Sequence, residues 1–227
     1  MSPTMSIPIV AFSDVLCVWA YVAELRLDEV KRAFGDQVSI QHRFCTVFGD
    51  TARKIPTTWA DRGGYDGFNA HLRHTGEQFP ETVIHPDLWR SVRPTSSWGA
   101  HLWLKAAQLD EAAGGCAPGA ADAAIRAMRA AFFRDARDIS SRTVQLEVLK
   151  AAGADPARLQ ALIDDGRAFA ALASDLQDAE AMRVQGSPTF VLNDGRQKLY
   201  GNVGFRIIEA NIQELLREPK PDQASWC

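Results

Sequence analysis

The sequence has no C-x-x-C motif and no cluster of cysteines and histidines at zinc-binding spacing. Its four cysteines are widely separated along 227 residues: Cys17, Cys45, Cys116 and Cys227. This distribution disfavours both a disulfide scaffold and a zinc ribbon, so we expect no metal. His71 and His74 are three residues apart, and we interpret them as part of a solvated helix face and not as a metal site.

Long hydrophobic runs and blocks of one charge are also missing. No apolar segment reaches the roughly 18 residues that cross a membrane, because Asp14 interrupts the run at residues 7–23. The 25 basic and 28 acidic residues are mixed along the chain, so the sequence has no cluster of basic residues of the kind that binds nucleic acid. The leader MSPTMS lacks the Lys or Arg of a secretion signal. We therefore expect a cytoplasmic protein that binds neither nucleic acid nor membrane.

The first 45 residues change from strand to helix and back to strand. The apolar run IPIVAFS predicts a buried strand over residues 7–13. Apolar residues then recur every three or four positions over about 16–34, which predicts a helix that ends at Gly35. Residues 38–44 alternate with strand period. This order predicts a right-handed β-α-β unit with parallel strands.

The rest of the chain divides into a helical part and a second strand-containing part. Residues 46–182 show helical periods and caps but no convincing strand, and loops with short helices are expected at the beginning of this region. Strands are predicted over 189–192 and 198–201, joined by the turn Asn193-Asp194-Gly195. An amphipathic helix is predicted over 205–216.

These elements predict an α/β protein in which one domain interrupts another. Residues 6–45 and 183–217 form the predicted α/β domain, and residues 46–182 form a helical insertion subdomain. The Pro-containing tail, residues 218–227, is expected to be disordered.

Cys17 lies where the first strand passes into the first predicted helix. Free N–H groups and the helix dipole favour a thiolate there, and can lower a cysteine pKa from about 8.5 to between roughly 3.5 and 7.5. Free cysteine is also among the most buried residue types. Taken alone, Cys17 therefore fits both a nucleophile and a small buried apolar residue. Asp14 could raise the pKa of the thiol or cap the helix, and we expect it to cap.

Pro188, in the stretch QGSPTF, directly precedes a predicted strand. Proline cannot lie inside a central strand ladder, so it marks an edge or a special turn. A cis Ser187-Pro188 bond and an ordinary trans proline both fit the position.

Taken together, SDVLCVWAY, the helical insertion and GSPTFVLNDG before a last helix resemble the DsbA-like thioredoxin-fold family. The resemblance covers residues 6–217 and is strongest to the branch of FrnE-type proteins, kappa-class glutathione transferases and 2-hydroxychromene-2-carboxylate isomerases. It implies a thioredoxin fold interrupted by a large all-helical insertion. It also implies Cys17 as the nucleophile, Trp19 and Ala20 as the rest of its motif, and a facing cis-proline loop at Ser187-Pro188.

The resemblance implies further contacts with substrate or glutathione. The segment SSWGAH is similar to the family's NTFDAH-like segment, with Ser96 where asparagine is frequent. After the hairpin, YGNVGFR matches the G-N-D-R stretch of the glutathione enzymes at Gly201 and Asn202, and Arg206 matches after a shift. The acidic residue that binds the glutathione amino group there is missing. The implied binding residues are Ser187, Pro188, Trp19, Ser96 and Asn202.

Ala20 stands where a two-cysteine enzyme carries its resolving thiol. Without that thiol, a mixed disulfide on Cys17 must be resolved by an outside thiol such as glutathione, or by another cysteine of this chain. Cys45 is the one internal candidate, because it follows the second strand at the same sheet edge. Strand alternation turns it toward the polar face of that strand. Cys116 and Cys227 are interpreted as incidental thiols.

Three functions fit these observations. The first is a monothiol thiol-disulfide oxidoreductase that acts through Cys17 on a disulfide-bearing protein or small molecule, with glutathione as co-substrate and no tightly bound cofactor. The second is a glutathione-dependent isomerase or transferase that acts on a small electrophile. The third is a redox-inactive module that binds a peptide or a partner protein. Relatives are often dimers, so the resemblance also allows a homodimer.

Overall fold

A computed structural model describes residues 6–217 of the chain. The predicted tail and Cys227 lie outside the described residues. The described strands are β1 (Ile7–Ser13), β2 (Val38–Phe44), β3 (Thr189–Leu192) and β4 (Gln197–Tyr200). The described α-helices are α1 (Val18–Phe34), α2 (Thr51–Thr58), α3 (Gly64–Gln78), α4 (Trp98–Ala112), α5 (Ala120–Phe133), α6 (Arg142–Ala151), α7 (Pro156–Asp164), α8 (Arg167–Ala181) and α9 (Phe205–Leu216).

The four strands form one mixed sheet in the order β2-β1-β3-β4. β1 and β2 are parallel, as predicted for the β-α-β unit, and β3 is antiparallel to both of its neighbours. The predicted turn joins β3 to β4, and its three residues have positive φ angles of 49°, 56° and 96° at Asn193, Asp194 and Gly195. β4 is shifted one residue toward the N-terminus from its predicted range. The prediction of an α/β thioredoxin fold is confirmed.

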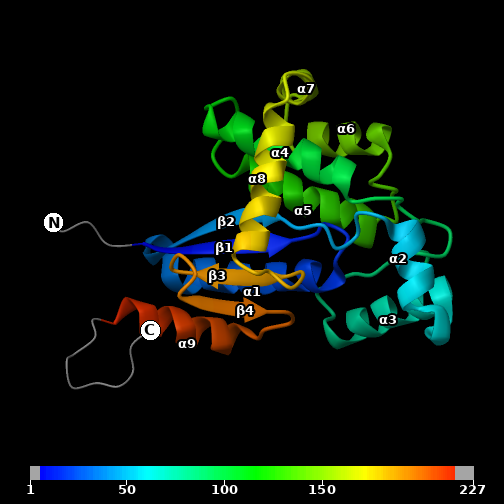
Figure 1. Ribbon diagram of the computed structural model, residues 1–227, viewed down its shortest axis with the longest axis horizontal. Coiled ribbons are helices and arrows are strands. Elements are labelled where there is room, and N and C mark those ends of the chain that lie inside the picture. Colours follow the sequence, from blue (N-terminus) through cyan, green and yellow to red (C-terminus); the bar gives the residue numbers. More distant parts are fainter. Residues whose placement is uncertain (1–5, 218–227) are drawn as a thin grey trace.

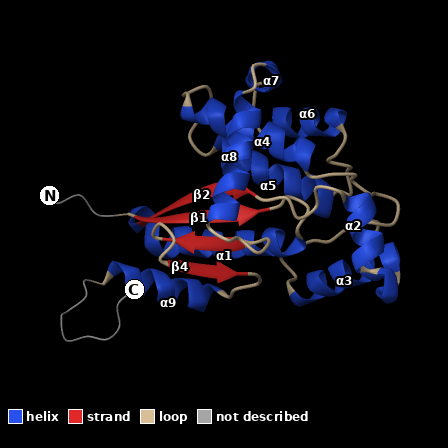
Figure 2. Ribbon diagram, in the orientation of Figure 1, coloured by secondary structure: helices blue, strands red, loops and turns tan. Residues whose placement is uncertain are grey.

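Helices cover both faces of the sheet (Figures 1 and 2). On one face, Ile9 of β1 belongs to a buried cluster with Leu27 of α1 and Ile212 of α9. On the other face, Phe12 of β1 packs in a cluster with Ala179 of α8. Because neighbouring residues of a strand point to opposite faces, β1 contributes to both layers of the core. The carboxyl end of β1 is therefore buried on both sides.

The helices α2 to α8 lie between β2 and β3 in sequence, where the helical insertion was predicted. Helices α4 to α8 pack together above the sheet in Figure 1, while α2 and α3 lie beyond the carboxyl end of β1. The sequence pattern before residue 95 predicted loops and short helices, whereas the structure has the 15-residue helix α3 in this region. No helix within residues 6–217 is long and apolar enough to span a membrane.

Candidate active site

The loop between β1 and α1, residues 14–17, is fixed by hydrogen bonds from each of its backbone N–H groups. The four acceptors, in chain order, are Ser187 Oγ at 2.9 Å, His101 Nε2 at 3.1 Å, Asp14 Oδ1 at 2.9 Å and Asp14 O at 3.0 Å. Buried backbone groups are costly unless they are paired, so this pairing holds one loop conformation. The loop consequently places the Cys17 side chain at a defined position.

Cys17 is the N-cap residue of α1 and faces the loop before β3. Its backbone is extended, with φ −85° and ψ 117°, so the helix begins at Val18 and not at residue 16 as predicted. The Cys17 thiol donates a hydrogen bond to Ser187 O at 3.2 Å. The Ser187-Pro188 peptide bond is cis. The structure thus brings together the two motifs that the sequence singled out.

Asp14 joins the Cys17 loop to the helical insertion. Its side chain is fully buried, and Oδ2 accepts hydrogen bonds from Val47 N at 2.9 Å, Phe48 N at 2.8 Å and Ser97 Oγ at 2.8 Å. Oδ1 accepts from Leu16 N, which precedes the helix. The expectation that Asp14 caps α1 is therefore wrong: the cap position belongs to Cys17, and the carboxylate binds three separate chain segments.

Ser97 and His101 are site residues that sequence reasoning did not single out. Both are fully buried in the segment SSWGAH, where Ser96 was the candidate. The hydroxyl of Ser96 instead accepts from Trp98 N at 3.1 Å, at the start of α4, whereas Ser97 reaches Asp14. The two serines differ in the contact of Ser97 with Asp14, which is 83 residues away in the sequence, so no local sequence pattern could have distinguished them.

His101 is held as a neutral ring beneath the Cys17 loop. It stacks on Phe44 with ring centroids 4.6 Å apart. Burial lowers the pKa of His101 from 6.5 to about 4, although the Asp14 carboxylate opposes this shift. Because Nε2 accepts a hydrogen bond from Val15 N, the ring proton must be on Nδ1. His101 therefore acts as an acceptor that positions the loop.

A buried ion pair supports the same loop from the side of α5. Arg129 donates to Glu24 Oε1 of α1 and to Ser13 Oγ at the end of β1, both at 2.7 Å. Its side chain is only 2% exposed. Removing one partner of such a pair leaves an uncompensated buried charge, so the three elements are held together.

The Cys17 thiol is protonated in this arrangement. The side chain is 6% exposed, and burial raises the pKa of Cys17 above the ordinary value of 9.0. A side-chain hydrogen bond from Ser187 and a backbone hydrogen bond from Ala20 oppose this rise, and the charge of Asp14 adds to it. The start of a helix does not lower the pKa of this cysteine, because desolvation has the larger effect.

Ala20 and Cys45 bear on how a disulfide at Cys17 is resolved. Ala20 is buried in the first turn of α1 and offers no thiol. Cys45 is 7% exposed, and its N–H donates to Ser13 O at 3.1 Å. It packs in the cluster of Phe12 and α8, whereas Cys17 belongs to the cluster under the insertion. Burial raises the pKa of Cys45 strongly.

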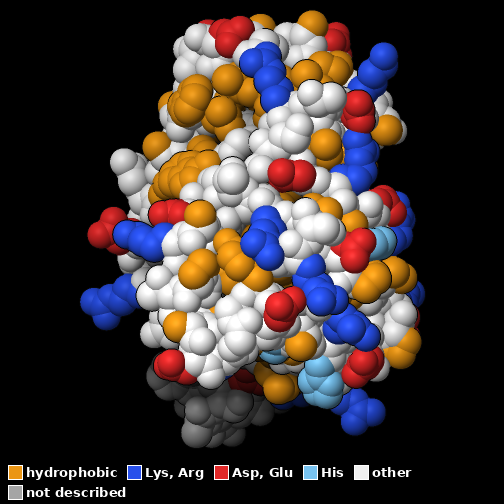
Figure 3. Space-filling model, turned by 90° about the vertical axis from the view of Figure 1, so that its right-hand side faces the viewer, with side chains coloured by type: hydrophobic (Ala, Val, Ile, Leu, Met, Phe, Trp, Pro, Cys, Tyr) orange, Lys and Arg blue, Asp and Glu red, His pale blue; other side chains and the backbone are white. Residues whose placement is uncertain are grey.

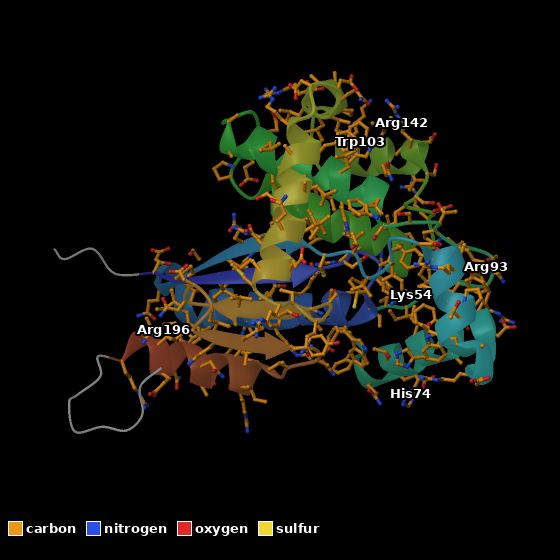
Figure 4. The ribbon with its side chains drawn as sticks, in the orientation of Figure 1. Lys54, His74, Arg93, Trp103, Arg142 and Arg196 are labelled. Atoms are coloured by element: carbon orange, nitrogen blue, oxygen red, sulfur yellow. The ribbon has the colours of Figure 1, made fainter. Side chains whose placement is uncertain are left out.

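Trp19 turns away from the thiol toward helix α3. Its ring is partly buried and meets His71 edge-on at 6.1 Å and Phe79 at 6.3 Å between centroids. The interpretation of a solvated helix face is wrong for His71, whose ring also lies 5.3 Å from that of Trp59. It holds for His74, whose side chain is 68% exposed on α3 (Figure 4).

The segment after β4 borders the Ser187-Pro188 loop. Gly201 N donates to Pro188 O at 2.9 Å, and Asn202 follows as an exposed residue. Tyr200 is 55% exposed and covers Gly186, since a Cβ atom on this glycine would come within 3.0 Å of the phenol oxygen. The phenol ring of Tyr200 is thus a further group at the border of the site.

Two cavities flank the segment Thr46-Val47 at this end of the molecule. The first, here called the α2 cavity, has a volume of about 690 Å³ and is lined by Arg53, Lys54 and Trp98 among others. The second, here called the α8 groove, has about 410 Å³ and is lined by Cys45, Glu180 and residues 184–186 among others. Figure 4 shows Lys54 on α2, and Figure 3 shows Lys and Arg side chains among hydrophobic ones on this face.

A family model described as DSBA-like thioredoxin domain matches residues 8–213 of the chain. This protein belongs to the DSBA-like thioredoxin domain family. Within the residues that the structure describes, this family member has no group of three or more His, Cys, Asp or Glu side chains that could hold a metal ion. No curated protein matches the sequence significantly.

Several solved structures share the fold of this DSBA-like protein. A probable DsbA oxidoreductase from Streptomyces coelicolor is 20% identical, with a TM-score of 0.74 and 96% of this chain and 93% of that chain covered. A 2-hydroxychromene-2-carboxylate isomerase is 16% identical, with a TM-score of 0.63 and coverage of 92% and 95%. The cytosolic disulfide reductase DsbM from Pseudomonas aeruginosa, solved with GSH, is 19% identical, with a TM-score of 0.61 and coverage of 91% and 99%.

Proposed function

We propose that this protein is a cytoplasmic thiol-disulfide oxidoreductase that works with the single thiol of Cys17 and is regenerated by glutathione. The observation that carries the proposal is the placement of Cys17 Sγ 3.2 Å from Ser187 O, with Ala20 in place of a second thiol. Such a site can form a mixed disulfide but cannot release it by itself. Cys45 stays the internal alternative, and its burial and raised pKa favour an external thiol.

The proposed reaction consists of two thiol-disulfide exchanges. Cys17 first loses its proton, and the thiolate attacks a glutathionylated substrate, so that Cys17 becomes bonded to the glutathione sulfur and the substrate leaves as a thiolate. A glutathione thiolate then attacks this mixed disulfide, which restores the Cys17 thiolate and releases glutathione disulfide. In the net reaction one free glutathione joins the glutathionyl group of the substrate as glutathione disulfide, the substrate leaves as a thiol, and no tightly bound cofactor is needed.

Ser187 can serve both stages of this cycle. In the resting site its carbonyl oxygen accepts from the Cys17 thiol. Once Cys17 is in a disulfide, that donor is lost and the carbonyl can accept an N–H of a bound peptide or of glutathione, as an exposed strand edge does. Its hydroxyl keeps the hydrogen bond from Asp14 N, so the loop stays in place.

The charges beside the Cys17 loop suit glutathione. Arg53 and Lys54 line the α2 cavity and can pair with a carboxylate. Glu180 lines the α8 groove and can pair with an ammonium group. Glutathione carries both kinds of group at opposite ends of a peptide, and residues 46–47 between the two cavities adjoin Asp14.

A coupled assay tests the proposed cycle. The enzyme is mixed with a glutathionylated peptide, glutathione, glutathione reductase and NADPH, and NADPH consumption is followed. We expect Cys17→Ser to abolish turnover, and Lys54→Gln to raise the KM for glutathione while Lys150→Gln, on the distant helix α6, leaves it unchanged. Turnover that persists in Cys17→Ser refutes the mechanism.

One observation favours a second candidate, a glutathione-dependent isomerase. The Cys17 thiol is a protonated hydrogen-bond donor, which suits a group that binds a glutathione thiolate without itself being oxidised. In that case Cys17→Ser, which keeps a donor, retains saturable glutathione binding, and no mixed disulfide forms at Cys17 during turnover.

A further inference from the structure

Another cavity lies away from Cys17, between β2 and the helices α4 and α5. Its volume is about 520 Å³, which is within the range of small-molecule sites. Its walls come from residues 40–42 of β2, the second half of α4, Pro118 and the first turns of α5. It shares no lining residue with the α2 cavity or the α8 groove. We call it the α4–α5 cavity.

The charged groups in its walls are already paired. Lys105 Nζ donates to the Asp175 carboxylate at 3.0 Å, and Asp122 accepts from Lys31 Nζ at 2.8 Å. The Glu111 carboxylate accepts two backbone N–H groups at the start of α5, at 2.9 and 2.7 Å. The free N–H groups of that helix start are therefore occupied, and no wall charge is left to bind an ion. The cavity suits a neutral molecule.

Four polar atoms in the walls make no hydrogen bond within residues 6–217. Two of them, His42 Nε2 and Asp122 Oδ1, lie 3.1 Å apart as an ion-pair contact, which leaves two atoms without any polar partner. One is Gln108 Oε1, because the amide nitrogen of Gln108 donates to His42 O at 2.9 Å and so fixes the orientation of the group. The other is Nδ1 of His42, whose side chain is 8% exposed. Buried polar atoms are nearly always paired in native proteins, so these two atoms indicate where a ligand binds.

Both atoms are acceptors. An amide oxygen can only accept. His42 Nε2 lies 3.1 Å from Asp122 Oδ1, and a carboxylate attracts the nitrogen that bears the proton. In a neutral His42 ring, Nδ1 then has no hydrogen and accepts as well. A ligand must therefore bring hydroxyl or N–H donors.

We infer that the α4–α5 cavity is a binding site for a neutral, mainly apolar small molecule, the size of a substituted aromatic ring, whose hydroxyl or N–H groups donate to Gln108 and His42. The remainder of the molecule packs against apolar side chains of the walls: Ile40, Leu109, Pro118, Ala121 and Ile125. The inference does not rest on the chemistry of Cys17.

The test compares two probes that differ in one group, phenol and toluene. Each is titrated into the ¹⁵N-labelled protein, and amide shifts are followed by NMR. We expect phenol to bind saturably with a dissociation constant on the order of 1 mM. Toluene leaves the acceptors unpaired and should bind at least about tenfold more weakly. The shifts should map to residues 40–42, α4 and α5.

Three variants connect the binding to this cavity. Gln108→Met removes the amide oxygen at similar length and should weaken phenol binding toward that of toluene. Ala112 lines the mouth of the cavity at an exposed position, so Ala112→Trp should block binding without disturbing the core. Ala113→Trp, at the next exposed position outside the cavity walls, is the control and should bind as the parent protein does.

The inference is overturned by any of three results: phenol does not saturate up to 50 mM, phenol and toluene bind equally, or the shifts map to the Cys17 loop instead. Equal binding by Ala112→Trp and Ala113→Trp also contradicts it. Since each readout is binding and not turnover, loss of the proposed Cys17 activity leaves this test unaffected.

Discussion

The Cys17 thiol donates a hydrogen bond to the carbonyl oxygen of Ser187 at 3.2 Å, although the two residues are 170 positions apart in the sequence. This bond requires the proton on sulfur, and burial raises the pKa of the thiol in the same direction. The resting site therefore holds a thiol that must lose its proton before it attacks.

The first prediction concerns the pH dependence of this loss. Since the pKa of Cys17 is raised above 9.0, its alkylation by iodoacetamide should still be accelerating at pH 9. Peptide mass spectrometry over pH 6–10 measures the rate at this one residue. A rate that levels off below pH 8 would show that Cys17 has the lowered pKa of an activated helix-start cysteine.

The second prediction concerns Asp14, whose charge raises the pKa of Cys17. Asp14→Asn should move the alkylation profile of Cys17 to lower pH. It should also lower the free energy of unfolding by about 2–3 kcal/mol, because buried hydrogen bonds to a charged group are lost. Ser97→Ala is the matched control: it removes one of these bonds at about 1 kcal/mol but keeps the charge, so the profile should not move. The same profile in both variants would exclude the electrostatic role of Asp14.

A third prediction follows from the single thiol. Ala20→Cys creates C-x-x-C in the first turn of α1, and its second thiol can attack a disulfide on Cys17. With glutathione disulfide as the oxidant, we expect the variant to release glutathione and form an internal disulfide, which then oxidises a reduced peptide stoichiometrically. The parent protein should instead accumulate a mixed disulfide between Cys17 and glutathione. Thiol titration and intact mass distinguish the two. Because Ala20 is buried, the larger side chain should cost about 1–3 kcal/mol of stability.

The fourth prediction is a loss of stability in mild acid. His101 has its pKa lowered from 6.5 to about 4, so the unfolded chain binds more protons than the folded one between these values. The free energy of unfolding should keep the full contribution of His101 above pH 6.5 and fall by about 3 kcal/mol as the pH drops to about 4. Urea unfolding from pH 4 to 7 measures this slope. His101→Gln, which can still accept from Val15 N, should reduce the slope, and an unchanged slope would assign it to other groups.

The sequence patterns were sufficient for the order of the elements, whereas the facing of Cys17 and the Ser187-Pro188 loop was implied only by the family resemblance. Hydrophobic periodicity changes from strand to helix after residue 13 and back to strand at residue 38, and residues 193–195 form a hairpin turn. These are local signals, and local interactions determine the corresponding strands, helix and turn. The start of α1 was placed two residues early, because the apolar periodicity does not reveal that Cys17 has an extended backbone. Helix ends depend on such details.

The inner parts of the site could not be predicted from local patterns. The Asp14 carboxylate is held by Ser97, 83 positions away, and His101 approaches it from the next turn of α4. The pKa of Cys17 depends on burial under the whole insertion, which outweighs the helix-start effect that the sequence indicated. The α4–α5 cavity likewise arises from the packing of β2 against two helices of the insertion.

The central claim is that the buried Cys17 is the thiol that this protein uses on disulfides. The most direct test is limited reaction with glutathione disulfide from pH 6 to 9, followed by peptide mass spectrometry. Cys116 is more exposed and serves as an internal reference. The account predicts that Cys17 is glutathionylated first, that its rate rises with pH, and that dithiothreitol reverses the modification. Modification of Cys116 with Cys17 still unmodified at pH 9 would contradict it.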